Sequence, residues 1–421
     1  MGPETTFEAR AGLCLAAARA LFVNGQSTDQ TLATAQRLAA GLGLSAVLLA
    51  RWGEISLQAD EAGSRLGRAV AADPTGVDME RVASVTRAID ALAVARIGPA
   101  QARIRIEAIS NHPPAPTWLF TLAAAAGAAA LSVIFGVQHL AAMALIAASA
   151  GAGALLRRGL ARLSANLFLQ PFCAALLAGV VGALAVRYQL SSSLRLVAVC
   201  PCMILVPGPH LLNAGLDLIR GRIHLGAARL VFAGLVVVAI SVGLLAGLAG
   251  FGAALPIDPA GRAVPLWQDV AAAGVAVAAY GVFFSTPVAM LGWPVAVGML
   301  AHALRWAAIA AFGAGPAGGA LIACVTAGLI LAPIADRSGA PFAAIGFAAV
   351  VSMMPGVFLF RMASGVVQII AGAPASAALA SATLADGATA VTIILVMSLG
   401  LLAPKLAVDA LGERFQRRRA S

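Results

Sequence analysis

Residues Leu205–Gly221 read LVPGPHLLNAGLDLIRG and lie inside a long apolar stretch of the chain. Proline removes a backbone donor and clashes with the preceding turn, while glycine permits the backbone to unwind. The Pro207-Gly208 pair therefore predicts a broken helix, with N–H groups freed on one side and carbonyls on the other. Within a bilayer, such a break is tolerated only where it is buried in protein or lines a cavity.

The composition around this stretch is that of a membrane protein. Of the 421 residues, 61% are hydrophobic and 11% are charged, whereas soluble domains carry about 25% charged residues. Apolar runs of about 20 residues, each enough to cross a bilayer core of roughly 30 Å, recur along the chain. We predict a mainly α membrane protein with ten transmembrane helices, at about 117–136, 138–156, 168–186, 194–219, 226–251, 267–285, 288–311, 317–335, 341–370 and 384–405.

Residues 1–112 differ from the rest of the chain and predict a small α/β domain. Its expected elements are a helix over 7–25, a helix capped by Ser27 or Thr28, a hairpin around Trp52-Gly53, and helices from Asp78 and from Pro99. The remainder divides into a first membrane half of five helices (113–251), a loop (252–266), a second half of five helices (267–405) and a basic tail (406–421).

The net charge of +10 belongs to the membrane part. Up to Pro116, eleven arginines balance eleven acidic residues. If the N-terminal domain is cytoplasmic, twelve basic residues fall on its side of the membrane: Arg157, Arg158, Arg162, Arg220, Arg222, Arg229, Arg337, Lys405, Arg414, Arg417, Arg418 and Arg419. Four fall near the other side: Arg187, Arg195, Arg262 and Arg305. This bias predicts that both termini are cytoplasmic, and it indicates a membrane topology signal rather than a nucleic-acid partner.

A second Pro-Gly pair occupies the corresponding place in the other half. Residues Met354–Gln368 read MPGVFLFRMASGVVQ and, like the first pair, lie in the fourth span of a set of five. An odd number of spans places a second repeat upside down relative to the first, so the pattern predicts two inverted five-helix repeats. Inverted repeats with matched breaks are typical of secondary transporters. The alternative is a chance match, because proline and glycine are ordinary in membrane helices.

Polar side chains follow each break at helical spacing and form a stripe. They are His210, Asn213, Asp217, Arg220 and His224 after the first break, and Arg361, Ser364 and Gln368 after the second. Ionisable groups within spans usually face a pathway or a partner. We therefore expect substrate to be bound by the two breaks and the nearby polar groups, namely Pro207, Gly208, His210, Asn213, Pro355, Gly356 and Arg361. A new helix N-terminus and Arg361 would both suit a carboxylate.

Asp217 and Arg220 are candidates for proton coupling or for a gate. Asp217 lies about 15 Å beyond the break at helical rise, so it could instead pair with Arg220 at the cytoplasmic surface. His302 with Arg305, and Asp386, are weaker candidates that we expect near the membrane interface.

The segment PGPHLLNAGLDLIRGRIHLGAARL resembles the signature of the threonine/serine exporter family. The matching positions are Pro207-Gly208, Asn213-Ala214, Asp217-Leu218, Gly221, Gly226 and Arg229-Leu230. AARALFVNGQSTDQTLATAQRLAAGLGL is similar to the family's cytoplasmic N-terminal domain, and the last five spans, with MMPGVFLFRM, look like its second membrane domain. The resemblance implies export of small hydroxy amino acids by the proton motive force, across a bacterial cytoplasmic membrane and without a cofactor.

This chain departs from the family pattern at two places. Pro209 follows the first break, and Ser285-Thr286-Pro287 stands where an arginine or asparagine is expected beside the proline. The exact substrate therefore stays open, and export of another small carboxylate metabolite is the alternative.

Other classes of function fit the sequence less well. An intramembrane enzyme would need a nucleophile with its base, a metal cluster or an acid pair, and we find no such motif. Cys200-Pro-Cys202 is better explained as small buried residues than as a metal site. A channel or scaffold with a cytoplasmic sensor domain remains a further alternative, and the sequence does not decide between a monomer and a homo-oligomer.

Overall fold

The computed structural model describes residues 6–61, 63–188, 190, 194–255, 264–338, 340–371 and 377–420, without the side chains of 194, 195 and 412–420. Arg262 of the predicted loop, the Arg195 side chain and the basic side chains of the predicted tail beyond Leu411 lie outside the described residues.

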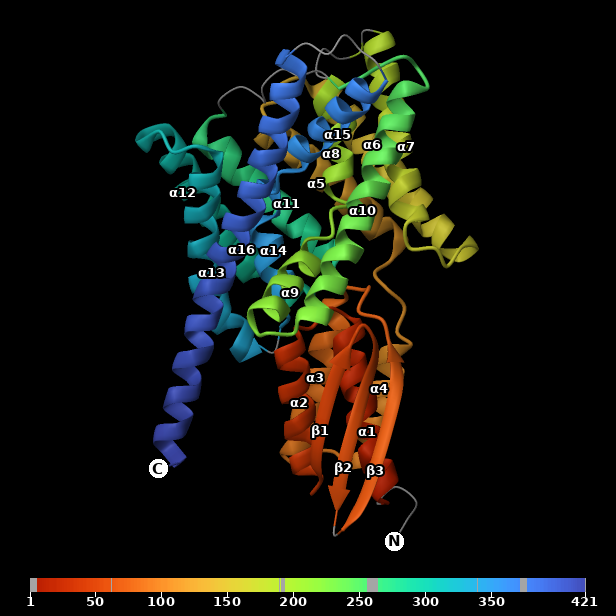
Figure 1. The fold of residues 1–421 in the computed structure, drawn as a ribbon, viewed down its shortest axis with the longest axis vertical. Coiled ribbons are helices and arrows are strands. Elements are labelled where there is room, and N and C mark those ends of the chain that lie inside the picture. The colour runs from red at the N-terminus through yellow and green to blue at the C-terminus, as the bar shows by residue number, and fades with distance from the viewer. Residues whose placement is uncertain are drawn as a thin grey trace.

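The first part of the chain forms four helices and a three-stranded sheet. The elements are α1 (Phe7–Val23), α2 (Thr28–Gly41), β1 (Ser45–Arg51), β2 (Gly53–Glu61), β3 (Ser64–Ala72), α3 (Met79–Ala93) and α4 (Pro99–Ser110). The strands are antiparallel in the order β1-β2-β3, and the helices cover one face of the sheet (Figure 1). Ser27 caps α2 and Asp78 caps α3, which confirms both predicted helix starts.

The prediction of a two-stranded hairpin missed β3. Its sequence, SRLGRAVAA, is mostly exposed along the strand and carries two arginines, so it lacks the apolar alternation that identifies a half-buried strand. Pairing with β2 decides its conformation instead.

The second part of the chain is a bundle of apolar helices. Eight are long enough to cross a membrane: α5 (Thr117–Ile134), α6 (Leu140–Leu163), α7 (Leu169–Arg187), α10 (Ile223–Ala249), α11 (Leu266–Phe283), α12 (Val288–Phe312), α13 (Pro316–Ser338) and α16 (Ala377–Ala420). This confirms a mainly helical, multi-pass membrane protein.

Two further spans are broken helices, which brings the number of spans to ten if each is counted once. In the first, α8 (Leu194–Met203) and α9 (Gly208–Ile219) meet at a bend of 55°. In the second, α14 (Phe342–Val350), a 3-10 turn (Val351–Met353) and α15 (Gly356–Ile370) give a bend of 65°. Both breaks fall at the predicted Pro-Gly pairs.

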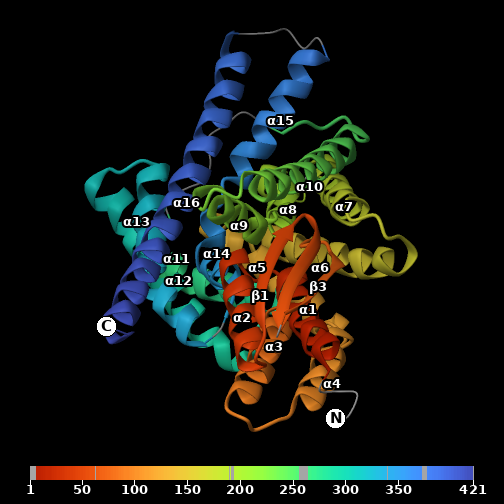
Figure 2. The same ribbon diagram turned by 60° about the horizontal axis from the view of Figure 1, so that its bottom comes forward.

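The N-terminal domain is docked on one end of the bundle (Figure 1), and Figure 2 brings this end toward the viewer. We call it the domain end and the opposite end the far end. The first N–H groups of α3 make the contact: Met79 donates to the Phe284 carbonyl and Glu80 to the Ser285 carbonyl. Burial raises the pKa of the Asp78 carboxyl, which caps α3 at this contact. Because Phe284 follows α11, this helix starts at the far end and finishes at the domain end.

Candidate functional site

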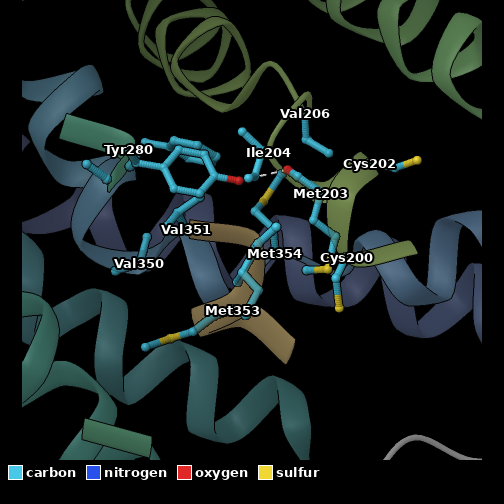
Figure 3. Close-up of a cluster of buried hydrophobic side chains, with 14 of the residues drawn as sticks. Cys200, Cys202, Met203, Ile204, Val206, Tyr280, Val350, Val351, Met353 and Met354 are labelled. Carbon is cyan, nitrogen blue, oxygen red and sulfur yellow. Dashed lines mark hydrogen bonds between the residues drawn. The ribbon is translucent and has the colours of Figure 1, made fainter. Parts of the chain in front are cut away.

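The two broken helices cross at the centre of the bundle. The start of α9 packs against α14, since a Cβ at Gly208 would overlap the Phe347 ring. The start of α15 packs against α8, since a Cβ at Gly356 would lie 3.1 Å from the Met203 side chain. The Tyr280 hydroxyl of α11 donates a 2.8 Å hydrogen bond to the Met203 carbonyl at the end of α8 (Figure 3). The freed backbone is therefore satisfied inside protein, as a break at membrane depth requires.

The close approach at Gly208 gives a first prediction. Gly208→Ala is expected to destabilise the protein by about 1–3 kcal/mol, because the added methyl group must displace a buried aromatic ring. Thermal unfolding of the purified protein in detergent measures this. Gly234→Ala on α10, where a Cβ meets no atom within 4 Å, is the control and should change little. Adding Phe347→Leu should restore part of the loss; equal stability of both glycine variants would contradict the packing described.

The N-terminus of α9 does not present free donors in this structure. The Gly208 N–H donates to the Val206 carbonyl, the N–H groups of His210 and Leu211 both donate to the Pro207 carbonyl, and Pro209 has no N–H. The position expected to bind a carboxylate is thus occupied by the chain itself, and Pro209 removes a donor there.

A narrow cavity lies on the other side of the first break, where α8 ends. Arg157 of α6 borders it, and its Nε and Nη1 atoms are buried without a hydrogen-bond partner in the described part of the chain. The buried Ser149 hydroxyl likewise has no hydrogen-bond partner among the described residues. The space holds about one water molecule. The sequence pattern identified Arg157 only as a topology signal. Other lining residues are Ala150, Gly153, Pro201, Ile204, Leu205 and Phe283.

The polar stripe of α9 faces the N-terminal domain. The His210 ring lies beside the backbone of residues 74 and 75, and the Asn213 amide donates a 3.2 Å hydrogen bond to the Gly25 carbonyl. The Thr28 hydroxyl donates to the Asp217 carboxylate at 3.1 Å. The α1–α2 loop, the start of α2 and the segment between β3 and α3 therefore cover His210, Asn213 and Asp217 at the domain end.

Asp217 is 1% exposed and is held by arginines of α10 and the turn before it. Its carboxylate lies 3.0 Å from Arg229 Nε, which is equally buried, and 3.4 Å from Arg222 Nη1. The pair with Arg220 that helical spacing allows is not formed, because Arg220 turns outward to Asp29 at 3.1 Å. Asp217 therefore lies at the domain end of the bundle rather than near the break, and its side chain is buried there.

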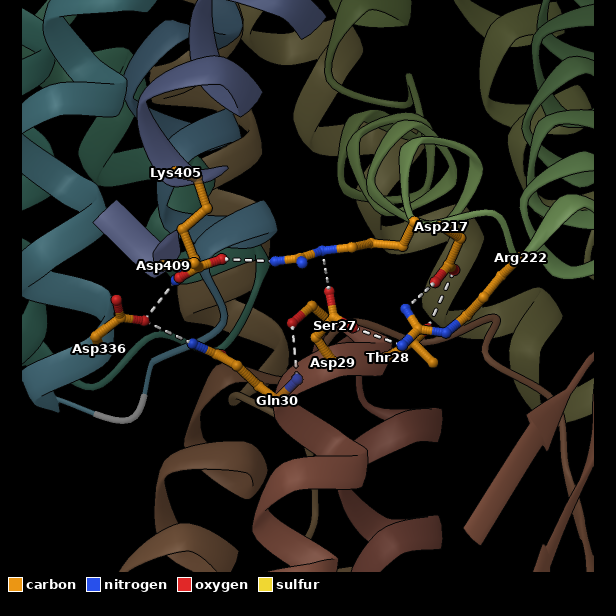
Figure 4. A network of polar contacts seen from close by, with 10 residues as sticks. Ser27, Thr28, Asp29, Gln30, Asp217, Arg222, Asp336, Lys405 and Asp409 are labelled. Atoms are coloured by element: carbon orange, nitrogen blue, oxygen red, sulfur yellow. Dashed lines mark hydrogen bonds and ion pairs between the residues drawn. The ribbon is translucent and has the colours of Figure 1, made fainter. Parts of the chain in front are cut away.

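Ion pairs extend from this point across both halves of the bundle (Figure 4). Arg220 also reaches Asp409 of α16 at 3.3 Å, and Lys405 binds Asp409 and Asp336 at 2.6 Å each. The Gln30 amide donates to Asp336 at 3.0 Å. The start of α2 thus contacts the first half through Asp29 and the second half through Gln30.

A second buried ion pair lies toward the far end. Arg361 Nε of α15 is 3.0 Å from the Asp386 carboxylate of α16, and both side chains are about a tenth exposed or less. Asp386 is therefore buried, against the expectation of an interfacial residue. Further along α15, the Gln368 amide donates to the Ser364 hydroxyl at 3.1 Å. In each half, an Asp–Arg pair joins the second segment of the broken helix to the helix that follows it.

The second break carries a buried polar relay. His302 of α12 is fully buried, its Nδ1 atom is 2.8 Å from Asp269 of α11, and its Nε2 atom contacts the Ser352 hydroxyl. Ser352 lies in the 3-10 turn just before Pro355-Gly356. The expectation that His302 is interfacial is wrong, because Asp269 and Ser352 satisfy both of its ring nitrogens inside the bundle. These partners come from different spans, so sequence spacing could not reveal them.

Comparison with known proteins agrees with this architecture. Two models of the threonine/serine exporter family match the chain, one over residues 12–250 and the other, described as threonine/serine exporter, ThrE, over residues 269–407. No curated protein and no solved structure matched the chain. The two matched regions divide at the loop between α10 and α11 and together cover most of the sequence, so the chain belongs to the threonine/serine exporter family.

Proposed function

We propose that the protein is a secondary active transporter that exports threonine and serine from the bacterial cytoplasm in exchange for entering protons. The crossing of two broken helices at the centre of the bundle carries the proposal, in a chain of this family. Matched breaks at midplane are the usual site of substrate binding in secondary transporters. The N-terminal domain and both termini are then cytoplasmic, so the domain end faces the cytoplasm and the far end faces outward.

The proposed mechanism is alternating access by two inverted repeats. The reciprocal packing of α9 on α14 and of α15 on α8 supports the repeat. The Asp217–Arg229 pair would act as the cytoplasmic gate and the Arg361–Asp386 pair as the outer gate. Both pairs are formed in this structure, which corresponds to a closed state between the two open ones.

Proton coupling is assigned to the second half. Asp269 lies in the first turn of α11 at the outer end, His302 lies deeper, and Ser352 lies beside the second break. The three groups thus form a path along which a proton from outside reaches the break. Asp217 remains the alternative proton carrier, although two arginines and a threonine hold its carboxylate.

Transport by purified protein in proteoliposomes tests the proposal. Radiolabelled threonine or serine should move away from the side of the membrane that carries the N-terminal domain, against its own concentration gradient. It should do so when an imposed pH gradient drives protons in the opposite direction. Excess unlabelled substrate on the opposite side should accelerate movement, because a carrier exchanges substrate and a channel does not. Transport of other small carboxylates but neither hydroxy amino acid would assign a different substrate, and flux without counterflow would indicate a channel.

A further inference from the structure

The partly buried guanidinium group of Arg157 borders the narrow cavity beside the first break, and no acidic side chain among the described residues pairs with it. Arg157 forms no ion pair among the described residues, and two of its guanidinium nitrogens are buried without partners. A buried, unpaired charge is costly, and proteins normally pair it. We propose that Arg157 binds the α-carboxylate of the exported amino acid, so that substrate supplies the missing partner. This inference rests on the proposed function.

The neighbouring arginine, Arg158, differs from Arg157 in its contacts. The Arg158 guanidinium donates a 2.9 Å hydrogen bond to the Ala115 carbonyl and lies 4.5 Å from the Phe120 ring centre. Arg157 lies over the Phe283 ring at 5.1 Å. This contact stabilises the cation through one face but leaves the N–H groups in the guanidinium plane available for a bidentate contact with a carboxylate.

The rest of the cavity complements a small zwitterion. Pro201 in the last turn of α8, and Ile204 and Leu205 just after it, line the cavity. A helix C-terminus carries partial negative charge that suits an ammonium group, and the Met203 carbonyl at this end also accepts from the Tyr280 hydroxyl. The unpartnered Ser149 hydroxyl offers a hydrogen bond to a hydroxylated side chain. A positive group, a negative helix end and a hydroxyl thus border one space at the break.

Small residues form most of the cavity wall. They are Ala124, Ala150, Gly153, Ala154 and Ala174, and the space between them holds about one water molecule, so the cavity must widen to admit even a small amino acid. The stacked rings of Phe120 and Phe283, with centroids 4.9 Å apart, lie where α5 starts and α11 ends, between the cavity and the domain end. We expect these rings to separate when threonine enters from the cytoplasm.

Transport kinetics of Arg157→Gln, with Arg158→Gln as the matched control, test the carboxylate contact. Hydrogen bonds to a charged partner contribute enough for the KM for threonine to rise roughly 10- to 100-fold in Arg157→Gln. Arg158→Gln should stay close to the unchanged protein, because its guanidinium contacts Ala115 and Phe120 instead. Arg157→Lys, which keeps the charge but loses the bidentate geometry, should fall between them.

A competition measurement on the unchanged protein tests the same carboxylate contact without depending on the folding of a variant. Threoninol, which has a hydroxymethyl group in place of the carboxylate, should compete poorly with labelled threonine, whereas serine should compete well. Equal competition by threoninol, or an unaltered KM in folded Arg157→Gln, would overturn the carboxylate contact while leaving the exporter proposal intact. An unchanged protein that transports neither threonine nor serine would overturn the exporter proposal, and this inference with it.

Discussion

His302→Gln is expected to abolish proton-driven accumulation of threonine while threonine counterflow continues. Glutamine can still bond to Asp269 and Ser352, so it preserves the packing, but it cannot take up and release a proton at neutral pH. The variant would then behave as an uncoupled carrier, which equilibrates its substrate across the membrane and does not concentrate it. Parallel assays in proteoliposomes, one with an imposed pH gradient and one with substrate exchange alone, separate the two activities.

The charges around His302 define the controls for this result. Asp269 of α11 and Arg305, one turn along α12, are the charged groups that face it, and α14 has none. The charged residues of α13, Asp336 and Arg337, lie in its last turn at the domain end. Asp269→Asn should reproduce the loss of coupling. His224→Gln, at an exposed histidine, should transport normally. Full accumulation by His302→Gln would remove this relay from the mechanism.

Asp217→Asn is expected to produce the largest loss of stability among single changes at the domain end of the bundle. The substitution leaves the Arg229 cation buried without its partner, which typically costs about 3–5 kcal/mol. Docking of the N-terminal domain should also weaken, because Thr28 and Arg222 bind the same carboxylate. Thermal unfolding in detergent and protease cleavage at the linker around residues 111–116 measure both effects.

A double variant shows whether the Asp217 carboxylate stabilises the protein only by pairing with Arg229. Asp217→Leu combined with Arg229→Met should recover most of the stability, because apolar replacement of a buried pair is often neutral or stabilising. Asp60→Asn, on the exposed sheet, is the control and should change little. If Asp217→Asn keeps full stability and loses only the response to the pH gradient, Asp217 is a proton carrier rather than a gate.

The sequence was informative wherever one segment determines its own structure. The bends occur at Pro207-Gly208 and Pro355-Gly356 because proline and glycine act locally on the backbone. Ser27 and Asp78 begin helices for a similarly local reason.

Local sequence patterns could not identify side chains that become partners only when the bundle folds. The carboxylate of Asp217 binds Arg229 across the α9–α10 turn rather than Arg220 on its own helix, since α9 and α10 pack together. From the sequence alone, Arg157 is an ordinary loop arginine. In the structure its guanidinium group packs beside the end of α8. The environment of such side chains depends on three or four helices, and no spacing rule encodes it.

The contact of α2 with both halves of the bundle makes the N-terminal domain a thermodynamic partner in transport. In the proposed mechanism, the two halves cannot separate at the domain end unless Asp29 leaves Arg220 or Gln30 leaves Asp336, so undocking of α2 and opening of the carrier would share one equilibrium. A molecule that binds the undocked domain more tightly than the docked one would shift this equilibrium toward the inward-open carrier, by no more than its difference in affinity for the two forms. In that mechanism the N-terminal domain would determine how readily the carrier opens at the domain end, without touching the exported amino acid.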